Sequence, residues 1–140
     1  MILDIEGVTM KTVFVNTIVF VKDLERAKAF YTELLGQKIL DDFGTITFFE
    51  NHLVLHQAKS IIKTVFKKQG SKTAFRQGRR NVLIYFESKD LEGMYKRIKQ
   101  AGVPIIHGIE QQAWGQKVFR FFDPDRHIVE IGEPFRTKEE

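Results

Sequence analysis

The sequence predicts an α+β fold in which two paired βαβββ modules form a curved, cup-shaped mixed sheet with the helices outside. The first observation is a repeat: Lys-Asp-Leu-Glu occurs at residues 22–25 and again at 89–92, an offset of 67 residues in a chain of 140. Each copy follows a run rich in β-formers and precedes a helical pattern that ends at a glycine, Gly36 or Gly102. The second observation is that three short strand patterns follow each helix, which is typical of largely antiparallel sheets.

Residues 12–57 form the first predicted module. Its first strand, 13–21, consists of β-formers, and alternation places three side chains on one face: Asn16, Ile18 and Phe20. Asp23 is a suitable N-cap for the helix that follows, because its carboxylate can accept hydrogen bonds from the first free N–H groups. Three more strands are then predicted, at 38–40, 45–50 and 52–57.

Residues 81–133 repeat the same order as the second module. A strand is predicted at 81–87, and Asp90 caps a helix. A loop is predicted at 110–116, and the turn 123–126 ends at Arg126, which either takes a positive φ or belongs to a different type of turn. The remaining strands are predicted at 103–106, 117–122 and 127–132.

A basic linker, 58–80, joins the modules, and a charged tail, 134–140, follows them. The linker is predicted to contain a short amphipathic helix at 60–68. Eight Lys and Arg residues lie between 59 and 80, whereas 51–86 contain no acidic residue. Such a stretch can attract an anionic small-molecule ligand, although a solvated linker is the simpler interpretation. Nucleic-acid binding is disfavoured, because only Phe66 and Phe75 interleave with the cations.

Composition excludes several classes of function. The chain has no cysteine, which excludes disulfides, thiolate metal sites and a cysteine nucleophile. No apolar run approaches the roughly 20 residues that a membrane-spanning helix needs, and the first ten residues lack the pattern of a signal peptide. A Walker loop, a dinucleotide fingerprint and a Ser-His-Asp arrangement are absent from the sequence. We therefore expect one cytoplasmic domain over residues 1–140.

Two segments resemble the vicinal oxygen chelate superfamily, which includes glyoxalase I, bleomycin- and fosfomycin-resistance proteins, methylmalonyl-CoA epimerase and extradiol dioxygenases. The first runs Val-Lys-Asp-Leu-Glu-Arg-Ala-Lys-Ala-Phe-Tyr over 21–31 and continues to Leu35-Gly36. The second runs from Trp114-Gly115-Gln116 through Phe-Asp-Pro-Asp at 122–125 to Ile-Val-Glu-Ile at 128–131. The resemblance covers about 12–133 and implies paired βαβββ modules, a cup-shaped site and a homodimer.

The resemblance also implies a divalent metal ion, held by one pair of side chains from each module. This chemistry suits His and carboxylate ligands. Glu130 takes the ligand position on the last strand, whereas the first-strand positions fall on Asn16, a weak neutral ligand, and on Leu83, which cannot bind metal. The fourth-strand alignment places Leu55 opposite Glu130, and the neighbouring His56 becomes a ligand only if the register differs by one residue.

Two hypotheses for function follow. The first is metal-assisted lyase, isomerase or dioxygenase chemistry on an oxygen-rich substrate, with Glu130 as catalytic base and as metal ligand together with His56. The second is a metal-free binding protein that sequesters a drug or metabolite. Asn16, Tyr85 and Trp114 are predicted to line the pocket, where the aromatic rings offer stacking surfaces. Glu130 has a structural alternative as well: a carboxylate exposed on the sheet face, or one paired with an arginine.

Overall fold

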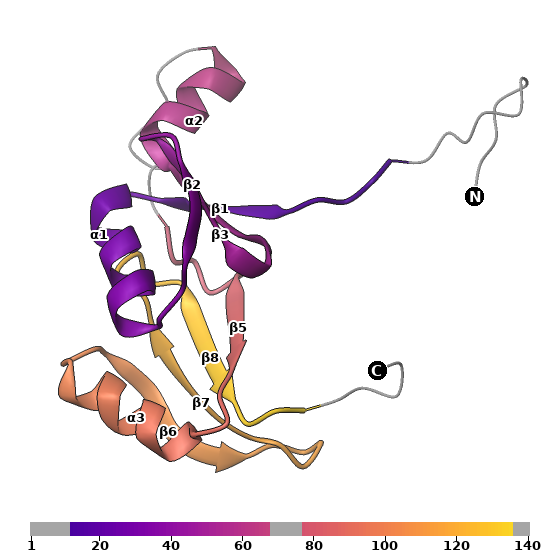
Figure 1. Cartoon of the computed structure of the whole chain (residues 1–140), viewed down its shortest axis with the longest axis vertical. Helices are drawn as coiled ribbons and strands as arrows, with labels where there is room; N and C mark the ends of the chain where they lie inside the picture. The colour runs from indigo at the N-terminus through magenta and orange to yellow at the C-terminus, as the bar shows by residue number, and fades with distance from the viewer. Residues whose placement is uncertain (1–11, 68–76, 136–140) are drawn as a thin grey trace, which may run out of the picture.

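The computed structural model describes residues 12–67 and 77–135 (Figure 1). The first module consists of β1 (Thr17–Val21), α1 (Leu24–Ala29), η1 (Phe30–Leu34), β2 (Ile39–Asp42), β3 (Ile46–Phe49), η2 (Glu50–His52) and β4 (Leu53–Gln57). Here η1 is a π-helical turn that continues α1, and η2 is a 3-10 turn. Helix α2 (Ala58–Phe66) begins directly after β4, two residues before the predicted start.

The second module consists of β5 (Leu83–Glu87), α3 (Leu91–Gln100), β6 (Ile105–Gln111), β7 (Lys117–Phe122) and β8 (Ile128–Gly132). Both predicted N-caps are confirmed, because Asp23 accepts a hydrogen bond from the Arg26 amide and Asp90 accepts one from the Gly93 amide. Gly36 and Gly102, which follow the first helices of the two modules, have a positive φ, as their lack of a Cβ allows. Arg126 also has a positive φ, of 67°.

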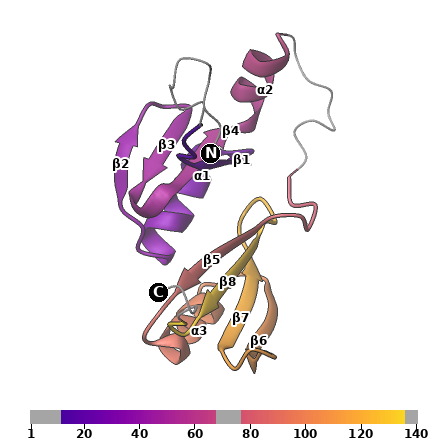
Figure 2. The same cartoon turned by 90° about the vertical axis from the view of Figure 1, so that its right-hand side faces the viewer.

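Each module forms one open four-stranded mixed sheet, and the predicted α+β fold of two βαβββ modules is confirmed. The strand orders are β1-β4-β3-β2 and β5-β8-β7-β6, with the first pair parallel and the others antiparallel. β1 and β5 are therefore edge strands. Helices α1 and α3 cover the same side of the two sheets, so that the strands face the viewer in Figure 2.

One apolar core lies on the helix-bearing side and includes residues from both modules. The α1–η1 segment packs against the second sheet through ring contacts of Phe30 with Phe121 and of Tyr31 with Phe86, both at 6.3 Å between centroids. Strand alternation then assigns the remaining side chains to the opposite side, which we call the outer face. The largest side chains of this core that are fully buried are Tyr31, Phe49, Phe119, Phe121, Leu55 and Ile98.

A buried polar contact also joins the modules. The Tyr31 hydroxyl donates to Asp123 Oδ2 at 2.7 Å, and His127 Nδ1 lies 3.0 Å from the same oxygen. Burial, followed by the charge of Asp123, raises the pKa of the Tyr31 hydroxyl well above its usual value. Nearby, the Lys22 amide donates to Asp125 Oδ1 at 2.6 Å. The turn at 123–126 therefore ties the second module to the first helix and to the end of β1.

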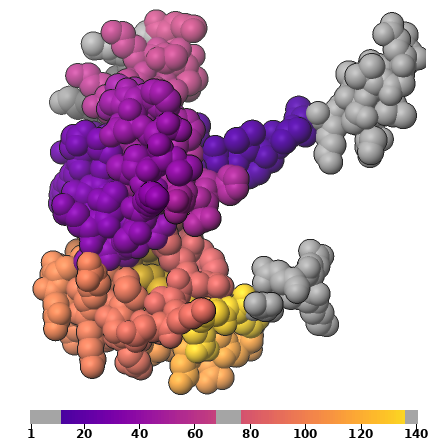
Figure 3. Space-filling view, viewed as in Figure 1, coloured from indigo at the N-terminus to yellow at the C-terminus, as the bar shows by residue number. Residues whose placement is uncertain are grey.

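Two segments differ from the prediction. β1 begins at Thr17 rather than at residue 13, because its parallel partner β4 begins at Leu53, which pairs with Thr17. Residues 12–16, which we call the arm, project from the body of the molecule (Figure 3). β6 runs to Gln111, into the predicted loop at 110–116, with register shifts on both sides of His107. Part of the predicted linker, 68–76, lies outside the described residues.

Candidate functional site

A row of polar side chains crosses all four strands of the second sheet on its outer face. Tyr85 of β5 pairs with Glu130 of β8, Glu130 pairs with Arg120 of β7, and Arg120 pairs with His107 of β6. Glu130 is buried, whereas Tyr85 is 45% exposed. The sheet register therefore sets a carboxylate, a guanidinium, an imidazole and a phenol side by side. We call these four residues the polar row.

Arg120 is the centre of the polar row. Its Nε donates to Glu130 Oε1 at 2.6 Å, its Nη1 donates to His107 Nε2 at 3.0 Å, and its Nη2 donates to Gln112 Oε1 at 3.1 Å. Because arginine only donates, His107 Nε2 must be the unprotonated nitrogen, and Nδ1–H is left to donate to the Gly108 carbonyl at 2.7 Å. The structural alternative for Glu130 is thus the one observed: its carboxylate is paired with an arginine.

Two exposed aromatic rings adjoin the polar row, and one buried glutamine fixes both. Gln116 Oε1 accepts from the Trp114 indole N–H at 2.8 Å, and Gln116 Nε2 donates to the Tyr85 hydroxyl at 2.7 Å. The Tyr85 hydroxyl in turn donates to Glu87 Oε2, which also accepts from the Phe135 amide at 3.2 Å. We call Trp114, Tyr85, Phe135 and Glu87 the aromatic corner.

The Tyr85 hydroxyl of the aromatic corner has a raised pKa, and two carboxylates lie near it. Burial and the hydrogen bond to Glu87 raise the pKa of Tyr85 to about 12, and the charges of Glu87 and Glu130 add to the shift. An anionic environment disfavours the phenolate, because it would place a further negative charge beside the two carboxylates.

A groove of about 530 Å³ runs between the two modules, next to the aromatic corner. One wall is β5, with Tyr85 and Glu87, and the other includes Thr17 and the turn η2. Within η2, Asn51 and His52 both have positive φ, 64° and 69°, which is uncommon for residues other than glycine. The volume is within the range of small-molecule sites.

The structure brings together three of the five predicted site residues. Glu130, Tyr85 and Trp114 lie on the second module, linked by strand pairing and by Gln116. Asn16 lies at the end of the arm, where its Oδ1 is 3.2 Å from His52 Nδ1. His56 lies on the first sheet, where it pairs with Phe20 and Ile46.

The observed register also corrects the predicted alignment of the fourth strands. Ile18 and Tyr85 are equivalent in the repeat, and they pair with Val54 and Glu130 respectively. The counterpart of Glu130 is therefore Val54 and not Leu55, which points into the core. His56 is on the outer face, as expected when the register differs by one residue from the predicted alignment. It nevertheless lies two residues further along β4 than the counterpart of Glu130.

The residues present do not form a fitting set of metal ligands. Within 12–67 and 77–135, no three His, Asp or Glu side chains cluster closely enough to hold one ion. The repeat-equivalent positions carry Asn16, Leu83 and Val54, of which the two apolar residues offer no ligand atom. The guanidinium of Arg120, 2.6 Å from Glu130, would repel a divalent cation at that carboxylate.

Sequence reasoning missed Arg120, Gln116 and His52. Arg120 alternates with Phe119 and Phe121, which are buried in the core, so its outward direction on β7 was readable from the pattern. Gln116 stands in a loop and gives no periodic signal, although only 3% of it is exposed. His52 lies in the groove wall because it belongs to η2, the turn that joins β3 to β4, and not to the strand predicted at 52–57.

Comparison with known proteins agrees with this duplicated α+β architecture. Residues 14–136 match the family described as Glyoxalase-like domain. The chain therefore belongs to this family, and with it to the vicinal oxygen chelate superfamily. A curated relative, the metallothiol transferase FosB of Lysinibacillus sphaericus (strain C3-41), is 27% identical over 121 residues, which cover 84% of this chain and 79% of that protein.

Solved structures show the same fold. A protein of unknown function from Agrobacterium tumefaciens str. C58 is 42% identical, with a TM-score of 0.81, over 91% of this chain and 98% of that one. A glyoxalase/bleomycin resistance protein/dioxygenase from Nocardioides has a TM-score of 0.70 at 19% identity, over 94% of each chain. The family thus includes lyases, transferases and resistance proteins. No helix among the described residues is long and apolar enough to cross a membrane.

Proposed function

We propose that this protein binds a small molecule without a metal ion, and that the ligand lies against the polar row and the aromatic corner. The observation that carries the proposal is the contact of Arg120 Nε with Glu130 Oε1 at 2.6 Å. The carboxylate that the family resemblance assigns to a metal is already neutralised by a guanidinium. We therefore expect the site to be disturbed by loss of Arg120 or Glu130, and not by loss of a metal ion.

Preorganised recognition groups support binding as the function. Trp114 and Tyr85 are 52% and 45% exposed, yet the polar atom of each ring is hydrogen-bonded to the buried Gln116. Rings that are held in place while exposed lose little conformational entropy when a ligand packs on them. The adjoining groove of about 530 Å³ offers room for a small molecule.

The metal-assisted hypothesis stays a prediction for this chain. The printed name of the FosB relative describes a metallothiol transferase, but that describes the relative. Of the four positions at which the family resemblance places metal ligands, only Glu130 and Asn16 carry a side-chain oxygen in this chain. We therefore assign no step of chemistry to a metal.

Metal analysis combined with thermal shift tests the proposal. Protein purified without chelator is analysed for zinc, nickel, manganese and iron, and is screened against a small-molecule library with and without EDTA. A ligand that binds only the folded state stabilises it by RT ln(1 + [L]/Kd), so the shift in Tm should be equal in the two screens. Stoichiometric metal, or stabilisation that disappears with EDTA, would contradict metal-free binding.

We propose further that the protein is a homodimer in which the arm packs on a second copy. Val13, Phe14 and Val15 are 81%, 80% and 62% exposed in the single chain. The arm extends the edge strand β1, and the second sheet also ends in an edge strand, β5, where Leu83 is 47% exposed. Apolar residues on strand edges are prone to pair with another chain. Sedimentation of the full chain and of Phe14→Asp tests this, since the variant should shift toward monomer.

A further inference from the structure

The aromatic corner combines rings with carboxylate in a way that the polar row does not. Trp114, Tyr85 and Phe135 are all exposed, and two of them contact Glu87: the Tyr85 hydroxyl and the Phe135 amide share its Oε2. No hydrogen bond engages the second oxygen of Glu87 in the described structure. The corner thus joins Glu87 directly to the Tyr85 hydroxyl and to the Phe135 backbone, and Trp114 is connected to Tyr85 through Gln116.

The adjoining groove is lined by acidic rather than basic side chains, although the whole chain has a net charge of +4. Among the described residues that line it, Glu50 and Glu87 are acidic and none is Lys or Arg, while Lys38 Nζ lies 4.0 Å from Glu50 Oε1. Arg120 is committed to Glu130, His107 and Gln112. Three cations lie near the corner in sequence: Lys89 is two residues from Glu87, Lys117 is three residues from Trp114, and Arg136 directly follows Phe135. The Lys117 amide donates to Glu133 Oε1, which places a carboxylate beside it.

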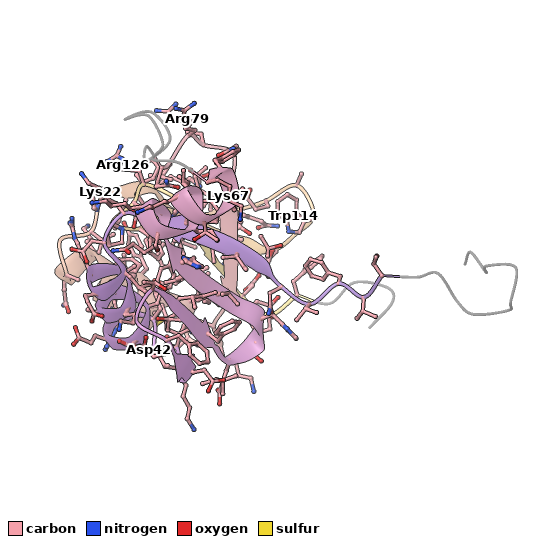
Figure 4. All side chains as sticks on the ribbon, turned by 90° about the horizontal axis from the view of Figure 1, so that it is seen from above. Lys22, Asp42, Lys67, Arg79, Trp114 and Arg126 are labelled. Carbon is pink, nitrogen blue, oxygen red and sulfur yellow. The ribbon has the colours of Figure 1, made fainter. Side chains whose placement is uncertain are left out.

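The described lysines of helix α2 lie away from the corner. This helix, which carries Lys59 and Lys63, is at the opposite end of the molecule from the turn between β6 and β7 (Figure 1). In Figure 4, Lys22 and Arg126 lie at the left of the molecule and Trp114 lies at the right. Residues 68–76 of the basic linker lie outside the described residues. Lys59 and Lys63 therefore do not supply the charge of this corner.

We propose that the aromatic corner binds the cationic end of an organic ligand, such as a quaternary or protonated amine, between the rings of Trp114, Tyr85 and Phe135 and the carboxylate of Glu87. This inference rests on the proposed small-molecule function and names the class of its ligand. A cation over an aromatic face is attracted by the ring quadrupole, and a carboxylate at the same site adds to the attraction. An anion meets repulsion from Glu87 at the same place.

Trp114 is the only tryptophan in the chain, so it reports on its own site. We would titrate the full chain with choline, with its neutral isostere 3,3-dimethylbutan-1-ol and with the anion 3,3-dimethylbutanoate. Binding is read from Trp114 fluorescence and from the NMR signal of its indole N–H. Choline should bind about five-fold or more tightly than the alcohol, and the anion should bind more weakly than both.

Matched variants locate the effect. Glu87→Gln keeps the size of the side chain and should reduce the preference for choline to about two-fold, because the rings remain and the charge is lost. Glu92→Gln, the same change on α3 at the opposite side of the sheets, should leave the preference intact. If Glu87→Gln does not fold, the comparison of the three probes on the unmodified protein still decides.

Two failures can be told apart. Equal binding of choline and the alcohol, tighter binding of the anion, or no choline response up to about 0.1 M overturns the cation inference. If the metal-free screen nevertheless finds neutral or anionic ligands that perturb Trp114, the proposed function stands and its ligand class is different. If no molecule of any charge perturbs the site, the proposed function falls too.

Discussion

The first sheet carries, on its outer face, a row of residues that matches the polar row position for position. Strand pairing joins Ile18, Val54, Phe48 and Asp41 across β1, β4, β3 and β2. The second sheet has Tyr85, Glu130, Arg120 and His107 in that order. Three of the four positions are apolar in the first module, and none is aliphatic in the second. The backbone fold is repeated in both modules, but the row of polar side chains is present only in the second.

This difference separates what the repeat needs from what the site needs. The side of both sheets that faces the helices is apolar in each module, because one core depends on it. The outer face is free to diverge, since its residues contribute less to that core. In the first module the row is apolar at three of its four positions, and Ile18 at its edge is exposed, which suits a partner surface. In the second module the outer face holds Arg120 and Glu130, which neutralise each other as an ion pair.

The largest expected effect comes from a matched pair of leucine substitutions in the two rows. Arg120→Leu leaves the buried Glu130 without its guanidinium and should lower the free energy of unfolding by roughly 3 kcal/mol. Phe48→Leu, at the same position of the first row, should cost no more than about 1 kcal/mol. Urea denaturation measures both. Equal losses would show that the two rows play the same structural part.

A graft of the first row onto the second makes the comparison sharper. The double variant Arg120→Phe with Glu130→Val copies Phe48 and Val54 and leaves no unpaired charge. Its free energy of unfolding should be within about 1 kcal/mol of the parent, because a buried ion pair replaced by apolar residues is often neutral. Ligand binding should nevertheless be lost, which thermal shift measures. Retained binding would show that the polar row is not part of the site.

The sequence predicts the architecture well because the fold depends on periodicity and caps, which are local. The repeat, Asp23, Asp90 and the turn glycines defined both modules, and Glu130 and Tyr85 were correctly placed on strands. The site was harder, since its chemistry depends on which side chain stands opposite which. Arg120 and Glu130 are ten residues apart, and only the β7–β8 register makes them neighbours. A one-residue error in β4 was enough to misplace the counterpart of Glu130.

Removal of the hydroxyl that joins the modules tests whether they unfold together. Tyr31→Phe removes the donor to Asp123 Oδ2, which stays buried, and should lower the free energy of unfolding by about 1–2 kcal/mol. Tyr95→Phe, on α3, is the matched control and should change it by less than about 0.5 kcal/mol. Hydrogen exchange should show that Tyr31→Phe weakens protection in both sheets. An effect confined to the first module would mean that the two halves open independently.

The smallest expected effect is a shift in the ionisation of Tyr85, and it measures the charge of the second outer face directly. Tyr85 should ionise near pH 12, as monitored by the ultraviolet absorbance of the phenolate in the unmodified protein and in Tyr85→Phe. The pKa is raised in the folded state, so the associated stabilisation is complete below the ordinary tyrosine pKa of about 10 and is lost as the pH rises toward 12.

Glu87→Gln should bring the pKa of Tyr85 down, because it removes both a charge and the acceptor of the hydroxyl. Ile18, the counterpart of Tyr85 in the first row, has no titratable group. A change in tyrosine ionisation that depends on Glu87 therefore comes from the second row. An unchanged pKa in Glu87→Gln would mean that Glu87 does not contribute to the shift, and the inferred attraction of a cationic ligand to this carboxylate would lose its support.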